Sequence, residues 1–556
     1  MDMTISAHFI TSVLVPGVLT LLFLAWWLTC LRIPFVERVA GLALMGLGTY
    51  VGAKASHESI GMFAMLFYAM PLGLTAWTIW LALGGRRSVF ARRWGAALAS
   101  LPFWIGFGLV RMVGLDGDLN ADMRWRWTPS HDETYIAVAP VSHAATTEPL
   151  VLSPGDWPGL RGPGGLGEVH GVRIATDWQK SPPKRLWRAE IGSGWSSFAV
   201  VGDRLFTAEQ RDEQHEGVVC LDASTGKPIW AHLDEAHHWE SQGGAGPRGT
   251  PTFDGGRIYA LGATGILNCL DAASGEKIWS KNIAADANAK EPMWGFCASP
   301  LVVDGNVIVY AGGGDKKGLL GYNAASGKLV WTAETGKQGY SSPQLVTLGD
   351  QKQVLLFDDA GIVAVDPVTG VVAWRFEDPT QTWRVVQPRA LGDGQVLFGS
   401  EDTGLVLLDL KPGKPVWTVT KRWSSQNLKS AYNDFVVLDG SVYGFDKGIF
   451  CCVDAATGDR RWKGGRYGHG QVLLLADQKL LLVLGEYGEV HLLAANPDKL
   501  EELGKFQALN DKTWNHPVIA HGRLYVRNDR EVACYELGAA DPRDSVARAP
   551  WRVDRE

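Results

Sequence analysis

The 556-residue sequence predicts an all-β propeller of eight four-stranded antiparallel blades, circularly closed and preceded by an α-helical membrane module. Three observations lead to this prediction. Four apolar stretches occupy the first 115 residues. From about residue 184 onward, a short unit containing an acidic residue, a glycine and a tryptophan recurs at fixed internal spacing. Glycine (66 residues) and tryptophan (24 residues) are abundant, as is typical of turn-rich β structure with regularly placed aromatic residues.

Four apolar stretches within residues 1–115 predict a membrane module of about four transmembrane helices, at about 9–31, 36–54, 61–84 and 94–114. The first and third exceed the roughly 20 residues that a helix needs to cross a bilayer. The second is shorter, and it spans only if the preceding Ile33–Arg38 adds a turn or if the helix packs against its neighbours.

The most basic short loop of this module lies at residues 84–93, and the positive-inside rule places it in the cytoplasm. Its cations are Arg86, Arg87, Arg92 and Arg93. The last helix then exits on the other side, so we expect a multi-pass protein of the bacterial inner membrane with its propeller in the periplasm. Met1–Ala7 contains no basic residue, which argues against a cleaved signal peptide.

The helices of this module have two interpretations, a simple anchor or a functional site such as a quinone site. The ionisable groups of note are Lys54, His57 and Arg111, and all three lie near predicted helix ends. This position favours the anchor.

Residues 116–183 are predicted to be an extracytoplasmic linker. The stretch 156–165 is so rich in proline and glycine that regular helix or central strand is excluded there. Trp157 and Leu160 would be costly to leave in water. The linker is therefore expected to pack over the propeller.

The repeat consists of Asp or Asn, a glycine four residues later and a tryptophan four residues beyond the glycine. Asp or Asn caps a tight turn, and glycine takes the left-handed conformation that closes a hairpin. The tryptophan then lies on the following strand, where its ring can pack across the gap to the adjacent blade. Six units keep this spacing: Asp222/Gly226/Trp230, Asp271/Gly275/Trp279, Asn323/Gly327/Trp331, Asp366/Gly370/Trp374, Asp409/Gly413/Trp417 and Asp454/Gly458/Trp462.

Two further blades follow the six units. Residues 469–494 supply strands of a seventh blade, whose final turn at 496–498 departs from the pattern. Residues 516–536 supply only three strands of an eighth. The missing strand is predicted at Arg185–Ile191, so that the two ends share one blade and the ring has no open edge. The propeller is thus predicted over residues 184–537, with a C-terminal tail at 538–556.

The Asp-x-x-x-Gly-x-x-x-Trp unit resembles the repeat of the pyrrolo-quinoline-quinone-like (PQQ-like) β-propeller superfamily. That superfamily includes quinoprotein alcohol and glucose dehydrogenases and the propeller lipoprotein of the outer-membrane assembly machinery. The resemblance covers about residues 155–537, and it implies the fold more specifically than any activity.

A ligand is predicted to bind at one mouth of the central channel, where the segments entering each innermost strand meet the turns between the second and third strands. Aromatic and cationic side chains gathered there suit a flat anionic ligand. The alternative is that several of them cap strands and plug the channel. The predicted ligand-binding residues are Arg248, Trp294, Tyr340, Gln387, Lys429, Arg466, His469, Trp514 and His516.

Two functions follow from the resemblance. The favoured one is a membrane-anchored binding or assembly scaffold with protein partners in the cell envelope. The alternative is a membrane-bound quinoprotein dehydrogenase that oxidises an alcohol or sugar and passes electrons to quinone, which implies PQQ with calcium.

The enzyme hypothesis meets an obstacle at Cys451 and Cys452. The resemblance implies a vicinal disulfide in a loop over the cofactor, whereas this pair lies inside a predicted strand, where the two side chains point to opposite faces. None of the seven cysteines belongs to a CxxC pair or to a cluster with zinc spacing. We therefore predict no metal site, no catalytic residue and no confident cofactor.

The overall charge balance separates this chain from nucleic-acid binders. The net charge is −6, and charged residues make up 20% of the sequence. A nucleic-acid-binding protein is expected to carry a concentrated basic surface instead. We therefore expect the inner membrane and envelope proteins as partners, and no nucleic acid.

Overall fold

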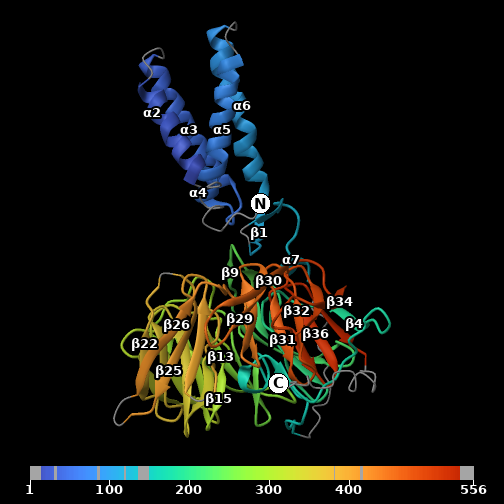
Figure 1. Ribbon diagram of the computed structural model, residues 1–556. Coiled ribbons are helices and arrows are strands. Elements are labelled where there is room, and N and C mark those ends of the chain that lie inside the picture. Colours follow the sequence, from blue (N-terminus) through green and yellow to red (C-terminus); the bar gives the residue numbers. More distant parts are fainter. Residues whose placement is uncertain are drawn as a thin grey trace, which may run out of the picture. The chain divides into compact units, whose positions relative to one another are not determined.

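The computed structural model describes residues 14–29, 34–83, 88–117, 120–135, 149–380, 382–392, 394–413 and 417–538 (Figure 1). The chain divides into two compact units. The first comprises Met1–Ser130 and Glu240–Gly244, and the second comprises His131–Trp239 and Ala245–Glu556. Parts of the sequence prediction lie outside the described residues: both ends of the stretch 9–31, the Arg86–Arg87 pair, residues 118–119 and 136–148 of the linker, and the tail from residue 539.

The first unit is built from helices, which appear at the four predicted apolar stretches. A hydrophobic cluster that includes Trp27, Met65 and Trp104 holds them together. After the last helix the chain forms a short antiparallel ribbon. The elements are α2 (Val15–Thr29), α3 (Phe35–Ala55), α4 (Gly61–Ala64), the π-helical turn η2 (Met65–Ala69), α5 (Met70–Leu83), α6 (Val89–Leu109), β1 (Val110–Leu115) and β2 (Ala121–Trp125).

Among the residues that the structure describes, no helix is at once long enough and apolar enough to cross a membrane. The prediction of four transmembrane spans is corrected accordingly. The third stretch is divided by η2 into helices of 4 and 14 residues. The fourth ends at Leu109, where β1 begins, rather than near residue 114.

The second unit is the eight-bladed propeller that the repeat predicted, and each blade has four antiparallel strands, which in blades 1 to 7 follow the sequence order from the channel outward. Blade 1 consists of β5 (Ala199–Val201), β6 (Arg204–Gln210), β7 (His215–Asp222) and β8 (Pro228–Glu235), and blade 2 consists of β11 (Thr252–Asp254), β12 (Arg257–Leu261), β13 (Ile266–Asp271) and β14 (Lys277–Asn282). Blade 3 consists of β15 (Leu301–Val303), β16 (Asn306–Tyr310), β17 (Leu319–Asn323) and β18 (Leu329–Ala333), and blade 4 consists of β19 (Gln344–Leu348), β20 (Gln351–Asp358), β21 (Gly361–Val365) and β22 (Val372–Glu377).

The remaining blades continue the same order. Blade 5 consists of β23 (Arg389–Ala390), β24 (Gln395–Ser400), β25 (Gly404–Lys411) and β26 (Thr418–Ser425), and blade 6 consists of β27 (Val436–Leu438), β28 (Ser441–Asp446), β29 (Ile449–Asp454) and β30 (Arg460–Arg466). Blade 7 consists of β31 (Gln471–Leu475), β32 (Leu480–Leu484), β33 (Glu489–Ala494) and β34 (Glu502–Gln507), and the three inner strands of blade 8 are β35 (Val518–Ala520), β36 (Arg523–Arg527) and β37 (Glu531–Glu536). Short additional elements are α7 (His131–Thr134), η3 (Pro163–Gly165), β3 (Glu168–Val169), β9 (Trp239–Glu240), β10 (Gly244–Ala245), α8 (Ile283–Ala287) and η4 (Ala476–Gln478).

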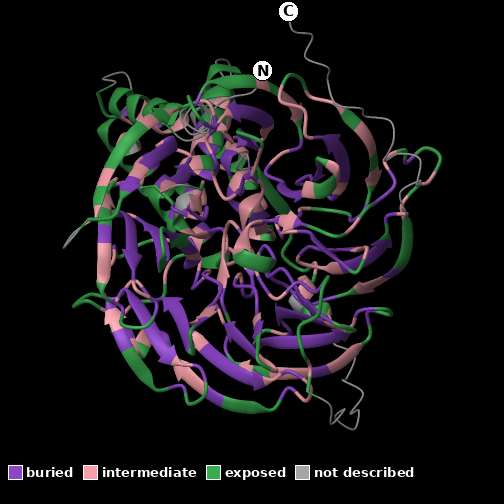
Figure 2. Cartoon of the chain, turned by 60° about the horizontal axis from the view of Figure 1, so that its bottom comes forward, coloured by how far each residue is buried: buried purple, intermediate pink, exposed green. Residues whose placement is uncertain are grey.

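The ring is closed by β4 (Lys184–Glu190), which pairs antiparallel with β37 as the outermost strand of the eighth blade. This pairing confirms the predicted closing strand. Figure 2 shows the blades arranged in a ring, with their inner strands buried. Each hydrophobic cluster of the propeller combines neighbouring blades, as where Tyr259 and Trp279 of blade 2 meet Tyr322 of blade 3.

Tryptophans on the outermost strands link most blades to the next, as the repeat predicted. Trp187 on β4 lies over Gly226 of the first blade, whose φ is +71°. A β-carbon at Gly226 would lie 2.5 Å from that ring, so the turn requires glycine for both space and conformation. The indole of Trp187 donates to the Ala223 carbonyl at 3.1 Å. Trp230, Trp279, Trp331 and Trp462 likewise donate to carbonyls of the following blade.

In the fifth blade, this linking position is held by Trp423 and not by the predicted Trp417. The hairpin between β25 and β26 is long, since Lys411 pairs with Thr418, and the residue opposite Leu407 is therefore Trp423. The ring of Trp423 lies over Gly458 of the sixth blade. The prediction chose the wrong tryptophan because it assumed the same hairpin length in every blade.

The seventh blade has no tryptophan on its outer strand, and the linker supplies one. Gly504 occupies the tryptophan position opposite Leu492. Trp178, which is only 5% exposed, packs on Gly504 and meets Phe506 edge to face with ring centres 5.5 Å apart. The linker thus completes the interface between blades 7 and 8.

The linker also enters the channel from the side of the turns between first and second strands. Trp157 is 2% exposed and forms a β-bridge with Val200 of the innermost strand β5. Further along, β3 pairs in parallel with β31 and makes the seventh sheet five-stranded. The expected packing of the linker over the propeller is therefore confirmed for Trp157.

Candidate functional site at the channel mouth

The mouth of the channel is lined by the segments that lead into the innermost strands, and hydrogen bonds join these segments from blade to blade. The Thr250 hydroxyl accepts from the Ser197 N–H at 3.0 Å. The Ser299 hydroxyl accepts from the Thr250 N–H at 2.9 Å, and Ser342 repeats the arrangement for Ser299. This belt fixes the backbone of the mouth, so side chains beside it are held in defined positions.

Four rings from four entering segments form what we call the first aromatic cluster: Trp195, Tyr432, His469 and Trp514. The ring centres of Trp195 and Trp514 are 4.9 Å apart. Tyr432 lies 5.0 Å from Trp514 and stacks on His469 at 5.1 Å. The Lys512 ammonium lies 4.3 Å from the Trp514 ring centre, within the range of a cation–π interaction.

A buried carboxylate, Glu486 in the turn between β32 and β33, orients this cluster. It is 2% exposed. One oxygen accepts from the Trp514 indole N–H at 2.9 Å, and the other accepts from the backbone N–H of His469 at 2.9 Å. The structure thus brings the predicted residues His469 and Trp514 together through a residue that the sequence analysis did not select.

Trp294, Tyr340 and Trp383 form a second aromatic cluster from three successive entering segments. The Trp294 ring centre lies 4.7 Å from that of Tyr340 and 4.8 Å from that of Trp383. Tyr340 is 6% exposed, whereas Trp383 is 38% exposed. The cluster therefore has a buried base and a solvent-facing edge.

Arg384 fixes the segment that presents Trp383. Its side chain is fully buried and pairs with Asp378 at 2.9 Å and with Asp402 at 2.7 Å. Its carbonyl accepts from the Tyr340 N–H at 2.6 Å. An arginine that pairs with two carboxylates holds its segment in one conformation, so Trp383 is preorganised.

Two other predicted residues, Gln387 and His516, lie deeper in the channel around Asp434. The Gln387 N–H donates to one Asp434 oxygen at 3.1 Å, and His516 Nε2 lies 3.4 Å from the other. Burial, and then Arg161, lower the pKa of His516 to about 3, so this imidazole is neutral at neutral pH. The charge partner of Asp434 is Arg161 of the linker, at 3.0 Å.

The remaining predicted residues belong to neither cluster. Lys429 lies 3.8 Å from buried Asp446, which also pairs with Arg460 and Lys463 at 2.9 and 2.7 Å. Arg466 is exposed at the end of β30. Arg248 donates to the Gly246 carbonyl and lies near the carboxylates of Glu216 in blade 1 and Glu291 in the loop between blades 2 and 3. The nine predicted residues therefore do not form a single site.

Besides Glu486, the sequence analysis missed Trp383, Lys512 and Arg161. Trp383 and Lys512 lie in entering segments, so the rule that selected Trp294 and Trp514 would have found them. Arg161 lies in the linker, outside the repeat, and only an inserted linker explains its position. No signal in the repeat could have identified it.

Glu216 on β7 is the buried carboxylate near Arg248, and it has an unusual protonation equilibrium. The side chain is 2% exposed; one oxygen accepts from the Ala263 N–H at 2.9 Å, and the other has no hydrogen-bond partner among the described residues. Burial raises the pKa of Glu216 to about 7, although the Ala263 N–H and Arg248 oppose the shift.

The stability of the propeller is expected to fall as the pH rises through the range from about 4.5 to 7, because the folded state retains the Glu216 proton that the unfolded chain releases. The free energy of unfolding should fall by about 3 kcal/mol in total over this pH range. Glu216→Gln should remove this pH dependence. Urea midpoints at pH 5 and pH 8 measure the effect. Glu213→Gln, an exposed change in the same blade, should retain the wild-type slope, and an unchanged slope in Glu216→Gln would contradict the assignment.

Two observations on the described residues bear on a calcium-bound quinone. Among the described residues, no group of three or more His, Cys, Asp or Glu side chains is placed to hold a metal ion. Cys451 and Cys452 are both free and buried in β29. Cys451 packs into the core between blades 5 and 6, and Cys452 packs into the core between blades 6 and 7. Their side chains therefore point to opposite faces, as the sequence predicted.

Part of the propeller is similar in sequence to known proteins. A family model described as outer membrane protein assembly factor BamB matches residues 215–464. BamB of Yersinia pestis is 26% identical over 187 residues, which cover 32% of this chain and 42% of BamB. The quinohemoprotein alcohol dehydrogenase ADH IIB of Pseudomonas putida is 31% identical over 185 residues, which cover 30% of this chain and 26% of the enzyme. The chain thus spans less than half the length of these relatives.

Among solved structures, the quinohemoprotein alcohol dehydrogenase of Comamonas testosteroni matches with a TM-score of 0.52 and 13% sequence identity. The match covers 72% of this chain and 82% of that enzyme. At this identity the likeness concerns the fold alone.

Proposed function

We propose that this chain, a PQQ-like β-propeller related to the assembly factor BamB and to quinohemoprotein alcohol dehydrogenases, is an envelope scaffold that binds polypeptide partners at its channel mouth. Similarity to an outer membrane protein assembly factor supports the class of function. The lack of a fitting donor set for a calcium-bound quinone among the described residues favours binding over the dehydrogenase alternative.

The second aromatic cluster carries the proposal. Tryptophan and tyrosine dominate the energetics of protein interfaces because they bury large rigid surfaces and lose little side-chain entropy. Trp294, Tyr340 and Trp383 supply such a surface, and the buried Arg384 pairs keep it in place before a partner arrives. Its exposed edge lies at Trp383.

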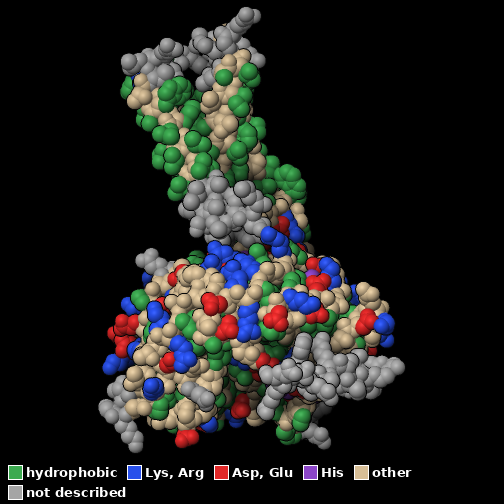
Figure 3. Space-filling view, in the orientation of Figure 1, with side chains coloured by type: hydrophobic (Ala, Val, Ile, Leu, Met, Phe, Trp, Pro, Cys, Tyr) green, Lys and Arg blue, Asp and Glu red, His purple; other side chains and the backbone are tan. Residues whose placement is uncertain are grey.

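The proposal also places the chain at the bacterial inner membrane, with the propeller in the periplasm. Many large apolar side chains of the helical unit are exposed, for example Leu21 at 67%, Leu22 at 61% and Leu98 at 63%. Figure 3 shows hydrophobic side chains gathered on the helices, whereas the propeller carries mixed charges. An apolar surface of this kind favours contact with lipid. Retention in the membrane pellet after carbonate washing, and cleavage of the propeller by protease added to spheroplasts, test this placement.

Site-specific photo-crosslinking tests the scaffold. A photoreactive amino acid at position 383 of the full-length chain, expressed in its native host, is expected to give discrete crosslinks to envelope proteins. The same amino acid at Val371, which is 64% exposed in the turn before β22, is the control and should give none. Trp294→Ala should reduce the crosslinks from position 383, because it removes the ring on which Trp383 packs.

Absence of crosslinks at position 383, or equal crosslinks at both positions, would contradict the scaffold. The enzyme alternative has its own measurement, in which the purified chain is titrated with PQQ and calcium. Saturable binding together with dye reduction by alcohols or sugars would replace the scaffold with a dehydrogenase.

A further inference from the structure

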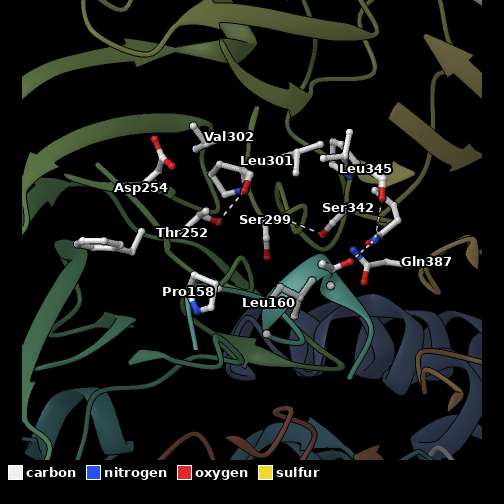
Figure 4. Close-up of a pocket in the computed structure, with 18 of the residues that line it drawn as sticks. Pro158, Leu160, Thr252, Asp254, Ser299, Leu301, Val302, Ser342, Leu345 and Gln387 are labelled. Carbon is white, nitrogen blue, oxygen red and sulfur yellow. Dashed lines mark hydrogen bonds between the residues drawn. The ribbon is translucent and has the colours of Figure 1, made fainter. Parts of the chain in front are cut away.

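A pocket lies between the linker and the innermost strands of blades 2 to 4, and no residue of either aromatic cluster lines it. Its volume is about 260 Å³. The linker contributes Pro158 and Leu160 to one wall, and inner strands of blades 3 and 4 contribute Leu301, Val302 and Leu345 to the other (Figure 4). The walls are thus largely apolar.

The linker shows how an extended chain binds to the innermost strands from this side. The Trp157 N–H donates to the Val200 carbonyl at 2.8 Å, and its carbonyl accepts from the Val200 N–H at 2.7 Å. The Pro158 carbonyl accepts from the Phe253 N–H at 2.8 Å. Val200 and Phe253 are each the central residue of a three-residue inner strand, β5 or β11. The linker therefore extends the sheets of blades 1 and 2.

Val302 is the corresponding central residue of the third blade, in β15. It pairs with Val307 as Val200 pairs with Leu205 and Phe253 with Ile258. Among the described residues, its backbone makes no hydrogen bond outside its own sheet. Because Val302 also lines the pocket, the pocket lies where the linker leaves an inner edge unextended.

Polar groups mark the two ends of the pocket. Gln387 is 8% exposed, and its side-chain oxygen has no hydrogen-bond partner among the described residues. An unsatisfied buried acceptor is costly and indicates a donor from outside the protein. Asp254 is exposed at the opposite end, and Figure 4 shows the apolar walls between the two.

We infer that this pocket binds an extended peptide segment of a partner, which adds as a strand to the inner edge of β15. Its backbone pairs with Val302, an apolar side chain lies between the walls, a donor meets the Gln387 oxygen, and a cationic residue lies near Asp254. Strand addition obtains affinity from backbone hydrogen bonds and selectivity from the side-chain pocket. The volume is slightly below the usual range for small-molecule sites, which suits a few residues of peptide.

This site goes beyond the proposed function, since no residue of either aromatic cluster lines it. The two can therefore fail separately: crosslinking at position 383 tests the mouth, and peptide binding tests the pocket.

The test uses a fluorescent hexapeptide of alternating valine and threonine ending in lysine, and the same peptide methylated on its central amide nitrogen. Fluorescence anisotropy with the detergent-purified full-length chain should show saturable binding of the first peptide. The methylated peptide should bind at least about tenfold more weakly, because it cannot form the strand pair. Equal binding of the two peptides, or no binding of either at millimolar concentration, overturns the proposal.

Two variants locate the binding. Val302→Pro removes the inward N–H and should abolish the preference for the unmethylated peptide. Ile519→Pro, at the central residue of β35 in blade 8, is the matched control and should keep that preference. Gln387→Leu should weaken the peptide about fivefold without lowering the melting temperature, because it removes an unsatisfied buried oxygen. Wild-type affinity in Gln387→Leu would overturn the assignment even if Val302→Pro unfolds.

Discussion

Replacing Trp187 by alanine is expected to lower the free energy of unfolding of the propeller by about 3–5 kcal/mol, the usual cost of truncating a buried tryptophan. Trp187 is 9% exposed on the closing strand β4. Its indole donates to Ala223, and its ring covers Gly226, so one side chain joins the eighth blade to the first. Chemical denaturation of the full-length chain, followed by tryptophan fluorescence, measures the loss.

Leu186→Ala is the matched control for this prediction. Leu186 is the neighbouring residue on β4, and it is 37% exposed. Because Leu186 is not among the residues of the core cluster that contains Trp187, its loss should cost less than about 1 kcal/mol. If the two variants were equally stable, the closing strand would not hold the ring together as the hydrogen bonds indicate.

Replacing Arg161 by alanine is expected to destabilise the propeller by a similar amount, about 3–5 kcal/mol, because it leaves a buried carboxylate without its charge partner. Arg161 pairs with Asp434 at 3.0 Å and donates to the carbonyls of Phe435 and Leu166 at 2.8 and 2.9 Å. Its side chain is 3% exposed and its φ is +58°, so the linker holds it in a strained conformation. Denaturant midpoints measure the effect.

Asp434→Asn provides the control for Arg161. In the double variant Arg161→Ala/Asp434→Asn, the uncompensated charge is gone, and much of the lost stability should return. The same cycle separates the ion pair from the backbone contacts that Arg161 makes to Phe435. A double variant no more stable than Arg161→Ala alone would show that those contacts, and not the charge, set the cost.

The blade repeat was predictable because each blade obeys local rules. Asp222 and Gly226 build a turn within a few residues, and Trp187 or Trp230 then follows from the need to cover the next glycine. Closure was predictable because blade 8 lacked a strand and a free strand lay before blade 1. Spacing failed at Trp417 because a longer hairpin changes the register without changing the pattern.

The site was predictable only in part, because its residues are brought together across blades. His469 and Trp514 meet through Glu486, which lies in a different part of its blade from the entering segments. Arg161 reaches Asp434 over 273 positions of sequence, and no local signal indicates such a contact. The length and hydropathy of the apolar stretches also predicted helices that are too long. A pattern of apolar residues does not show where η2 interrupts a helix or where α6 ends.

The pairing of β37 with β4 has a consequence for the order in which the protein is made. Arg188 meets Glu531 across 343 positions of sequence, so the ring cannot close until both β4 and β37 have been synthesised. Until then β4 has no partner strand, and the blades that have already formed belong to an open ring. Contacts so distant in sequence slow folding, and exposed strand edges invite pairing with other chains. Removal of β37 is therefore expected to be more damaging than its six residues suggest, because it leaves the ring open.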